Sequence, residues 1–159
     1  MACAAELPLA GTTVWATDAS ADAIDVARAN LAGRGRRGAN VRLALGDWFE
    51  ALPAELRGAV DVVVSNPPYI ADDDPDVDGS VREWEPARAL FAGVEGLDAI
   101  RRIVGEAREW LRPGGWLVLE IGHRQGDVTA ALMRSAGWCE VEVRHDLAGR
   151  HRFVLGRNP

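Results

Sequence analysis

Short apolar segments alternate with helix-forming segments along almost the whole of this 159-residue chain, and this alternation restricts its fold more than any other feature. The apolar segments are rich in β-branched or aromatic residues, which is typical of strands. Strands that alternate with helices predict an α/β fold with a mostly parallel sheet. The expected strands are 14–17, 41–45, 60–64, 116–121, 140–144 and 152–155.

Three amphipathic helices are expected between these strands, at 20–31, 96–111 and 127–136. Ser20 is a plausible N-cap of the first helix, whose early turns are acidic. The second helix ends at the turn Pro113-Gly-Gly. Apolar residues fall on one face of the first helix at Ile24, Ala27 and Leu31, and on one face of the second at Leu97, Ile100, Val104, Ala107 and Leu111.

Two connections have a composition that predicts their structure. The short turn 146–150 between the last two strands predicts an antiparallel hairpin. The acidic segment 72–78, which follows the third strand, is expected to be an exposed loop.

Composition excludes several classes of protein. The length indicates a single domain, 1–159, and no apolar run reaches the roughly 18–20 residues of a membrane span. Two cysteines, Cys3 and Cys139, indicate a reducing compartment rather than a disulfide framework. The net charge of −6 argues against a broad nucleic-acid-binding surface and favours a cytoplasmic protein with a discrete partner. The histidines do not have metal-ligand spacing with either cysteine, so no metal site is expected.

The segment Gly33–Gly38, GRGRRG, matches the dinucleotide-binding pattern G-x-G-x-x-G. That pattern requires a preceding strand and a following helix. Here an expected helix precedes the glycines and a strand follows them, so we interpret the segment as a flexible basic turn.

The most specific motif is Asn66-Pro67-Pro68-Tyr69, directly after the third strand. Two prolines cannot continue the interior of a sheet, so the chain must leave the sheet at the carboxyl end of this strand, where open α/β sheets bind ligands. Asparagine and backbone carbonyls can accept hydrogen bonds from a planar NH₂ group while the tyrosine ring covers its face. The alternative is a strand-terminating turn with a packed tyrosine.

Acidic residues follow two other strands. Asp18 is placed to accept hydrogen bonds from both hydroxyls of a ribose, although it could instead cap the following helix. Asp47 could accept from an adenine-type amine while Trp48 lies along the ring, and the alternative is a turn anchored by a buried tryptophan. Because these residues and the Asn66 motif end consecutive strands, we expect them all at one edge of the sheet.

With these motifs the chain resembles the catalytic domain of the HemK/PrmC family, S-adenosylmethionine-dependent methyltransferases that modify a glutamine side-chain amide in peptide chain release factors. The NPPY motif is shared with nucleic-acid amino methyltransferases, whereas 84–90 and 146–150 are much more particular to this family. The resemblance runs from about Pro8 to Arg157 and rests on ATDAS, GDWFEAL, VVVSNPPYI, VREWEPARALFAG, GLDAIRRIV, LRPGGWLVLEIG and HDLAGRHRFVLGR.

The resemblance implies a Rossmann-like methyltransferase sheet with an antiparallel C-terminal hairpin and S-adenosyl-L-methionine as cofactor. It implies that Asp18 binds the ribose, that Asp47 and Trp48 bind the adenine, and that Asn66 contacts both cofactor and substrate. The catalytic segment holding the amide would be Asn66, Pro67, Pro68 and Tyr69.

Family members carry a helical recognition domain, then a strand and a Gly-rich loop, before the region that this chain resembles. We therefore expect an N-terminally truncated catalytic domain that lacks the first strand, which lies between 14–17 and 60–64 in the family. Two alternatives stay open: a nucleic-acid amino methyltransferase of the N6-adenine type, and an inactive truncated fragment.

Overall fold

The computed structural model describes residues 10–71 and 92–159. The chain divides into two compact units, Met1–Glu55 and Leu56–Pro159. The acidic segment 72–78 and the family-specific segment 84–90 lie outside the described residues. None of the helices in the described part of the chain is long and apolar enough to cross a membrane.

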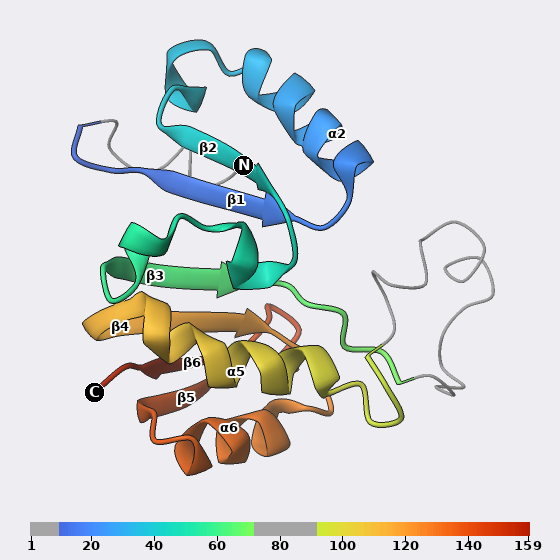
Figure 1. Cartoon of the computed structure of the whole chain (residues 1–159). Helices are drawn as coiled ribbons and strands as arrows, with labels where there is room; N and C mark the ends of the chain where they lie inside the picture. The colour runs from blue at the N-terminus through green and yellow to red at the C-terminus, as the bar shows by residue number, and fades with distance from the viewer. Residues whose placement is uncertain (1–9, 72–91) are drawn as a thin grey trace, which may run out of the picture. The chain divides into compact units, whose positions relative to one another are not determined.

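The N-terminal unit contains a β-α-β arrangement (Figure 1). Strand β1 (Val14–Asp18) pairs in parallel with β2 (Val41–Leu45), and helix α2 (Ala21–Ala32) connects them. The predicted N-cap is confirmed, because the Ser20 hydroxyl accepts a hydrogen bond from the Ala23 N–H at 3.4 Å. This parallel pairing brings the carboxyl ends of both strands to one edge.

The glycine-rich segment after α2 has the context that the sequence predicted. It contains a 3-10 helix, η1 (Gly35–Gly38), between α2 and β2. The pattern therefore follows a helix and precedes a strand, the reverse of a dinucleotide-binding loop. Two further 3-10 helices, η2 (Trp48–Ala51) and η3 (Ala54–Leu56), come after β2.

The C-terminal unit contains a four-stranded mixed sheet in the order β3-β4-β6-β5. Strands β3 and β4 are parallel, whereas β6 is antiparallel to both β4 and β5. The predicted C-terminal hairpin is thus confirmed. The elements are β3 (Val60–Ser65), α5 (Asp98–Trp110), β4 (Leu111–Glu120), α6 (Gly126–Ser135), β5 (Cys139–His145) and β6 (His151–Arg157).

Helices α5 and α6 cover one face of this sheet (Figure 1). The sheet residues beneath them are inaccessible to solvent: Leu117, Leu119 and Val154 are 0% exposed. The apolar stripe predicted for α5 is buried, and Ile103 and Trp110 extend it. The core of this unit therefore lies between the two helices and the sheet, as burial of alternate strand residues requires.

Strand β4 begins five residues earlier than the sequence predicts. Leu111 pairs with Val60, and the pairing then jumps to Val62 with Trp116, so the intervening turn bulges out of the ladder. A strand interrupted by proline and two glycines lacks a continuous apolar pattern, which is why its first residue was assigned to the helix.

Strands β1 and β3 are each the last strand of their own sheet. On β3, Val62 is 50% exposed and Val64 is 63% exposed. Apolar strand residues of this kind are ordinarily buried. The edge of each sheet therefore has backbone groups without a strand partner among the described residues.

The hairpin turn between β5 and β6 is organised by one carboxylate. Asp146 Oδ1 accepts from the N–H groups of Ala148 at 2.8 Å and Arg150 at 3.0 Å, and Oδ2 accepts from the Arg150 Nε at 3.0 Å. The backbone hydrogen bond from Arg150 is the main cause that holds the pKa of Asp146 below its ordinary value of 3.8. The ionised form is therefore favoured by folding.

The Asp146→Asn substitution is expected to lower the melting temperature modestly at neutral pH. Because the folded pKa is depressed, the contribution of the carboxylate is present above about pH 3.8 and is lost as the pH falls further, through the folded pKa. Thermal melts by circular dichroism at pH 7 and below pH 3.8 measure this difference. Glu142→Gln, which removes an exposed ion pair to Arg144 on the same hairpin, is the control. A difference between the Asp146→Asn variant and wild type that is independent of pH would contradict the assignment.

Candidate functional site

The Asn66–Tyr69 segment leaves the sheet at the carboxyl end of β3, as predicted. The last residue of β3, Ser65, pairs with Leu119 of β4. Beyond it Asn66 is exposed, Pro67 is buried, and Pro68 and Tyr69 are half-buried. Because proline has no N–H group, neither proline can donate to a neighbouring strand, and the ladder ends here.

Both the ring and the backbone carbonyl of Tyr69 contact the turn that follows β4. The ring lies against Gly122, where an added Cβ would be 3.4 Å from Tyr69 Cδ2. The Tyr69 carbonyl accepts a hydrogen bond from Gln125 Nε2 at 2.9 Å. Tyr69 as a whole is half-buried.

The turn that precedes α5 contacts the same segment. The Ala92 N–H donates to the Ile70 carbonyl at 3.0 Å. Gly96 has φ +66°, and a Cβ added there would lie 2.3 Å from the Tyr69 carbonyl oxygen. The close approach of this turn to Tyr69 therefore requires glycine at position 96.

The N-terminal unit places the other predicted site residues at the carboxyl edge of β1 and β2. Asp18 and Leu45 are paired at the ends of these strands, and the Gly46 N–H donates to the Asp18 carbonyl at 3.0 Å. Asp18 and Asp47 are exposed, and Trp48 is half-buried. The structure thus brings the Asp18 end and the Asp47–Trp48 end together.

Asp18 also makes a contact that fits the alternative prediction, in which it supports the start of helix α2. Its Oδ1 accepts from the Ser20 N–H at 2.8 Å, next to the start of α2. The N-cap itself is Ser20, so Asp18 supports the helix entry through one oxygen. A carboxylate has further acceptor capacity on its second oxygen.

The backbone at Trp48 has an uncommon conformation, with φ +47°. A left-handed conformation is unfavourable for a bulky residue and is found mostly at turns and functional sites. The turn is also close-packed, because a Cβ added at Gly46 would lie 2.9 Å from Ala51 Cβ. Phe49, rather than Trp48, is the buried aromatic of this turn, at 7% exposed.

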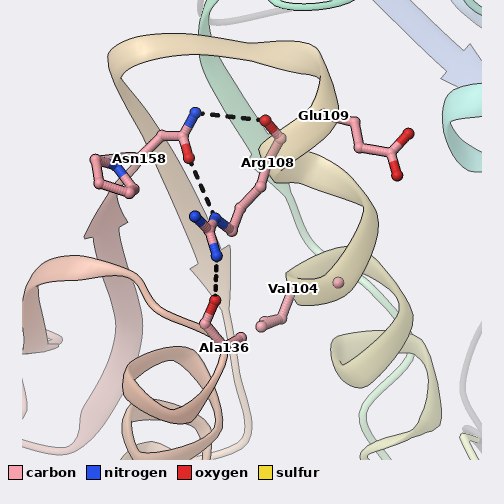
Figure 2. Close-up of a pocket in the computed structure, with 7 residues that line it drawn as sticks. Val104, Arg108, Glu109, Ala136 and Asn158 are labelled. Carbon is pink, nitrogen blue, oxygen red and sulfur yellow. Dashed lines mark hydrogen bonds between the residues drawn. The ribbon is translucent and has the colours of Figure 1, made fainter.

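A hollow of about 390 Å³ lies elsewhere in the C-terminal unit (Figure 2). In Figure 2, Arg108 lies between Asn158 and the carbonyl of Ala136. The hollow is at the amino end of β4, because the Asn158 N–H donates to the Gly115 carbonyl at 2.8 Å. It contains none of the residues predicted to bind cofactor or substrate.

Gln125 is a residue that the sequence analysis missed. It is the N-cap of α6, and its side chain contacts the predicted catalytic segment. The sequence could have indicated this residue, because Gln125 follows β4, the parallel neighbour of β3, and so lies at the same sheet edge as Asn66.

No group of three or more His, Cys, Asp or Glu residues in the described ranges could hold a metal ion.

Comparison with known proteins identifies close relatives. No family model matches the chain. A release factor glutamine methyltransferase of Xylella fastidiosa (strain 9a5c) is 43% identical over 159 residues, which cover 100% of this chain and 55% of the relative. One from Bordetella pertussis is 46% identical over 143 residues, covering 90% of this chain and 51% of the relative. The chain therefore spans about half the length of the curated relatives it matches.

Solved structures share the fold at lower identity. A methyltransferase from Pyrococcus furiosus has a TM-score of 0.64 and 19% identity, with 92% of this chain and 62% of that chain covered. TrmN from Thermus thermophilus has a TM-score of 0.58 and 18% identity, with 99% and 39% covered.

The chain shares its mixed α/β fold with the solved methyltransferase of Pyrococcus furiosus. Over its whole length the chain is homologous to release factor glutamine methyltransferases, which confirms the resemblance found in the sequence.

The Gly96→Ala substitution is expected to destabilise the C-terminal unit by more than about 1 kcal/mol, because it adds a Cβ at positive φ against the Tyr69 carbonyl. Urea unfolding measures the change. Gly105→Ala is the control, since Gly105 lies within α5 with nothing within 4 Å of the added Cβ. That control should be stabilising by roughly 0.5–1 kcal/mol. Equal effects of the two alanines would contradict the contact.

Proposed function

We propose that residues 1–159 form part of one catalytic domain that transfers a methyl group to the side-chain amide nitrogen of a glutamine in peptide chain release factors, in the cytoplasm. The observation that carries this proposal is the placement of Asn66–Tyr69 at the carboxyl end of β3, in a chain homologous to release factor glutamine methyltransferases. The exposed Asn66 beside a rigid Pro-Pro pair is what an amide-binding segment requires.

The chemistry explains why such a segment is needed. An amide nitrogen is a poor nucleophile, because its lone pair is delocalised into the carbonyl. Asn66 and the Pro67 carbonyl would accept the hydrogens of the NH₂ group in its plane, and the Tyr69 ring would lie over its face. Positioning of this kind can contribute up to about 7–11 kcal/mol in favourable cases.

The fold implies S-adenosyl-L-methionine as cofactor, which supplies an electrophilic methyl group on a sulfonium centre. The exposed residues at the carboxyl edge of β1 and β2 fit its nucleoside part. Asp18 would accept hydrogen bonds from the ribose hydroxyls and Asp47 from the adenine amine, while Trp48 lies along the base. Asn66 would contact both cofactor and substrate.

A protein substrate is favoured over a nucleic acid by charge. The chain carries a net charge of −6, whereas proteins that bind nucleic acids broadly present a basic face. The names of the homologues favour the same substrate class.

The proposal is tested by methyl transfer to a purified release factor. The enzyme is this chain preceded by the N-terminal segment of the Xylella fastidiosa relative, because the chain spans 55% of that protein. Labelled methyl should appear on a glutamine of the release factor. Label on DNA or RNA instead would support the alternative class of amino methyltransferase, and no transfer to either would refute the proposed function. Transfer by the extended protein but not by the 159-residue chain would favour an inactive truncated fragment.

Asn66→Ala in this extended protein should nearly abolish transfer and leave the fold intact. The lost hydrogen bonds act on the transition state, where removal of one such contact costs about 2.7–4 kcal/mol. Asn30→Ala, an exposed asparagine of α2, is the matched control and should retain full rate. Retention of more than about a tenth of the wild-type rate by the Asn66 variant would refute the catalytic role.

Asp18→Ala should weaken cofactor binding by roughly ten- to a hundredfold, because a charge-assisted contact to ribose is lost. Asp18→Asn retains an acceptor for the Ser20 N–H and separates the two roles of the carboxylate. It should weaken binding as well, with the melting temperature preserved. Calorimetry measures the affinity, and Asp22→Ala, in the first turn of α2, is the control. Unchanged affinity with a large fall in melting temperature would favour the helix-entry role alone.

A further inference from the structure

The Asn66–Tyr69 segment needs an external contact to hold it, because its own backbone offers few donors. Proline has no N–H group, so Pro67 and Pro68 cannot be tied down through hydrogen-bond donation. The upstream end is fixed where Ser65 pairs with Leu119 in the sheet. The downstream end is fixed through a carbonyl oxygen, that of Tyr69.

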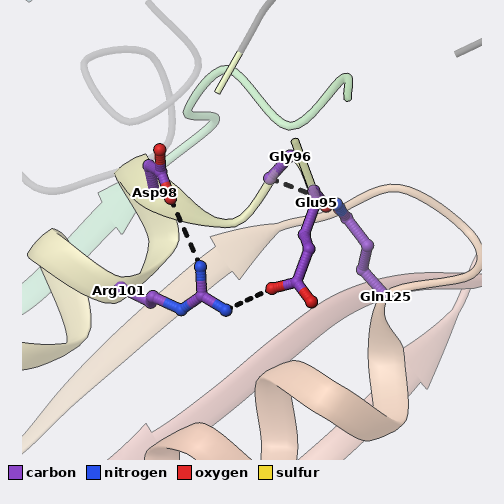
Figure 3. Close-up of polar contacts among 5 residues, drawn as sticks. All are labelled: Glu95, Gly96, Asp98, Arg101 and Gln125. Atoms are coloured by element: carbon purple, nitrogen blue, oxygen red, sulfur yellow. Dashed lines mark hydrogen bonds and ion pairs between the residues drawn. The ribbon is translucent and has the colours of Figure 1, made fainter. Parts of the chain in front are cut away.

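Gln125 supplies that external contact with its side-chain amide. Its Nε2 donates to the carbonyls of Tyr69 at 2.9 Å, Gly96 at 3.1 Å and Glu95 at 3.3 Å. Its Oε1 accepts from the Gly122 N–H at 3.0 Å. Figure 3 shows Gln125 beside Glu95 and Gly96. One amide group thus joins the ends of β3 and β4 and the turn before α5.

The chemistry of these partners determines the orientation of the amide. The two hydrogens of Nε2 are shared among three carbonyl oxygens, and Oε1 accepts from one backbone N–H. A rotated amide would place its oxygen against the carbonyl oxygens and its NH₂ against an N–H group. A neutral amide can donate to these carbonyls and accept from the N–H at the same time, whereas a carboxylate at position 125 has no donor and would be repelled by the three carbonyl oxygens.

The surroundings of Gln125 keep it in place. Its own N–H donates to the Gly122 carbonyl at 2.9 Å and its carbonyl accepts from Thr129, so its backbone forms the entry to α6. The turn on its other side is held by Arg101, which pairs with both Glu95 and Asp98 (Figure 3). The hydrogen bond to Glu95 raises the pKa of Arg101, so this guanidinium stays charged.

We propose that Gln125 is a positioning residue for methyl transfer, which sets the place of Tyr69 and thereby of the amide-binding segment through three backbone carbonyls. This inference rests on the function proposed above. Gln125 makes no chemical step of its own. Its effect is on the orientation of the bound amide, where a misplacement of about 1 Å can cost roughly a hundredfold in rate.

Two variants in the extended protein separate positioning from stability. Gln125→Glu keeps an oxygen that accepts from the Gly122 N–H but replaces the donating NH₂ group with a second oxygen. Gln125→Met removes both the acceptor and the donor without adding charge. The matched controls are Asn158→Asp and Asn158→Leu. Asn158 Nδ2 likewise donates to three backbone carbonyls, those of Leu111, Arg112 and Arg108, at the amino end of β4.

Both Gln125 variants should lower kcat by roughly tenfold to a hundredfold, with the cofactor affinity unchanged. The Asn158 variants should lose comparable thermal stability and retain kcat. Equal kcat values in the Gln125 and Asn158 variants would overturn the proposal, because the effect would then be general destabilisation.

A second measurement does not depend on activity. Tyr69 is the single tyrosine of this chain, so carbonyl-labelled tyrosine in the 159-residue chain gives one resonance that reports the hydrogen bond from Gln125. The resonance should shift in both Gln125 variants and stay in place in both Asn158 variants. An unmoved resonance overturns the positioning role. Should the wild-type extended protein fail to methylate a release factor, the proposed function fails, and this resonance alone decides whether Gln125 holds Tyr69.

Discussion

The parallel pairing of β3 with β4 is the interaction on which the C-terminal unit depends. Val62 to Ser65 pair in register with Trp116 to Leu119, so both strands end at the same edge. The motif after β3 and the turn after β4 are therefore neighbours, although 56 positions separate Tyr69 from Gln125. The pairing is stabilised by burial, because Leu117 and Leu119 are 0% exposed beneath α5 and α6.

Because of that pairing, different residues at the sheet edge have different structural roles. The prolines make the Asn66–Tyr69 segment rigid and remove its backbone donors. Glycine allows close approach, since a Cβ at Gly96 would be 2.3 Å from the Tyr69 carbonyl. The side-chain amide of Gln125 then donates hydrogen bonds to the Tyr69 and Gly96 carbonyls. Substrate binding by Asn66, as proposed, and support by Gln125 are thus separate tasks of separate residues.

Most of the fold could be predicted from periodicity. Five of the six predicted strands and the three predicted helices lie within two residues of their predicted bounds, and the Ser20 cap and the α5 stripe are confirmed. The error at β4 arose because Pro113 and its glycines conceal the pairing of Leu111. The roles of Asp18, Asp47, Trp48 and Asn66 stay predictions, although β1 and β2 do bring the first three to one edge.

The sequence by itself determined the class of fold, the relationship to release factor glutamine methyltransferases and the identity of the Asn66 motif. These depend on local patterns, because apolar periodicity, proline geometry and contiguous motifs are properties of neighbouring residues. Only the tertiary structure decided that Gln125 contacts Tyr69 and that Gly96 must be glycine. Both facts arise from strands and turns that are distant in sequence, where hydrogen bonding and close packing depend on register in space.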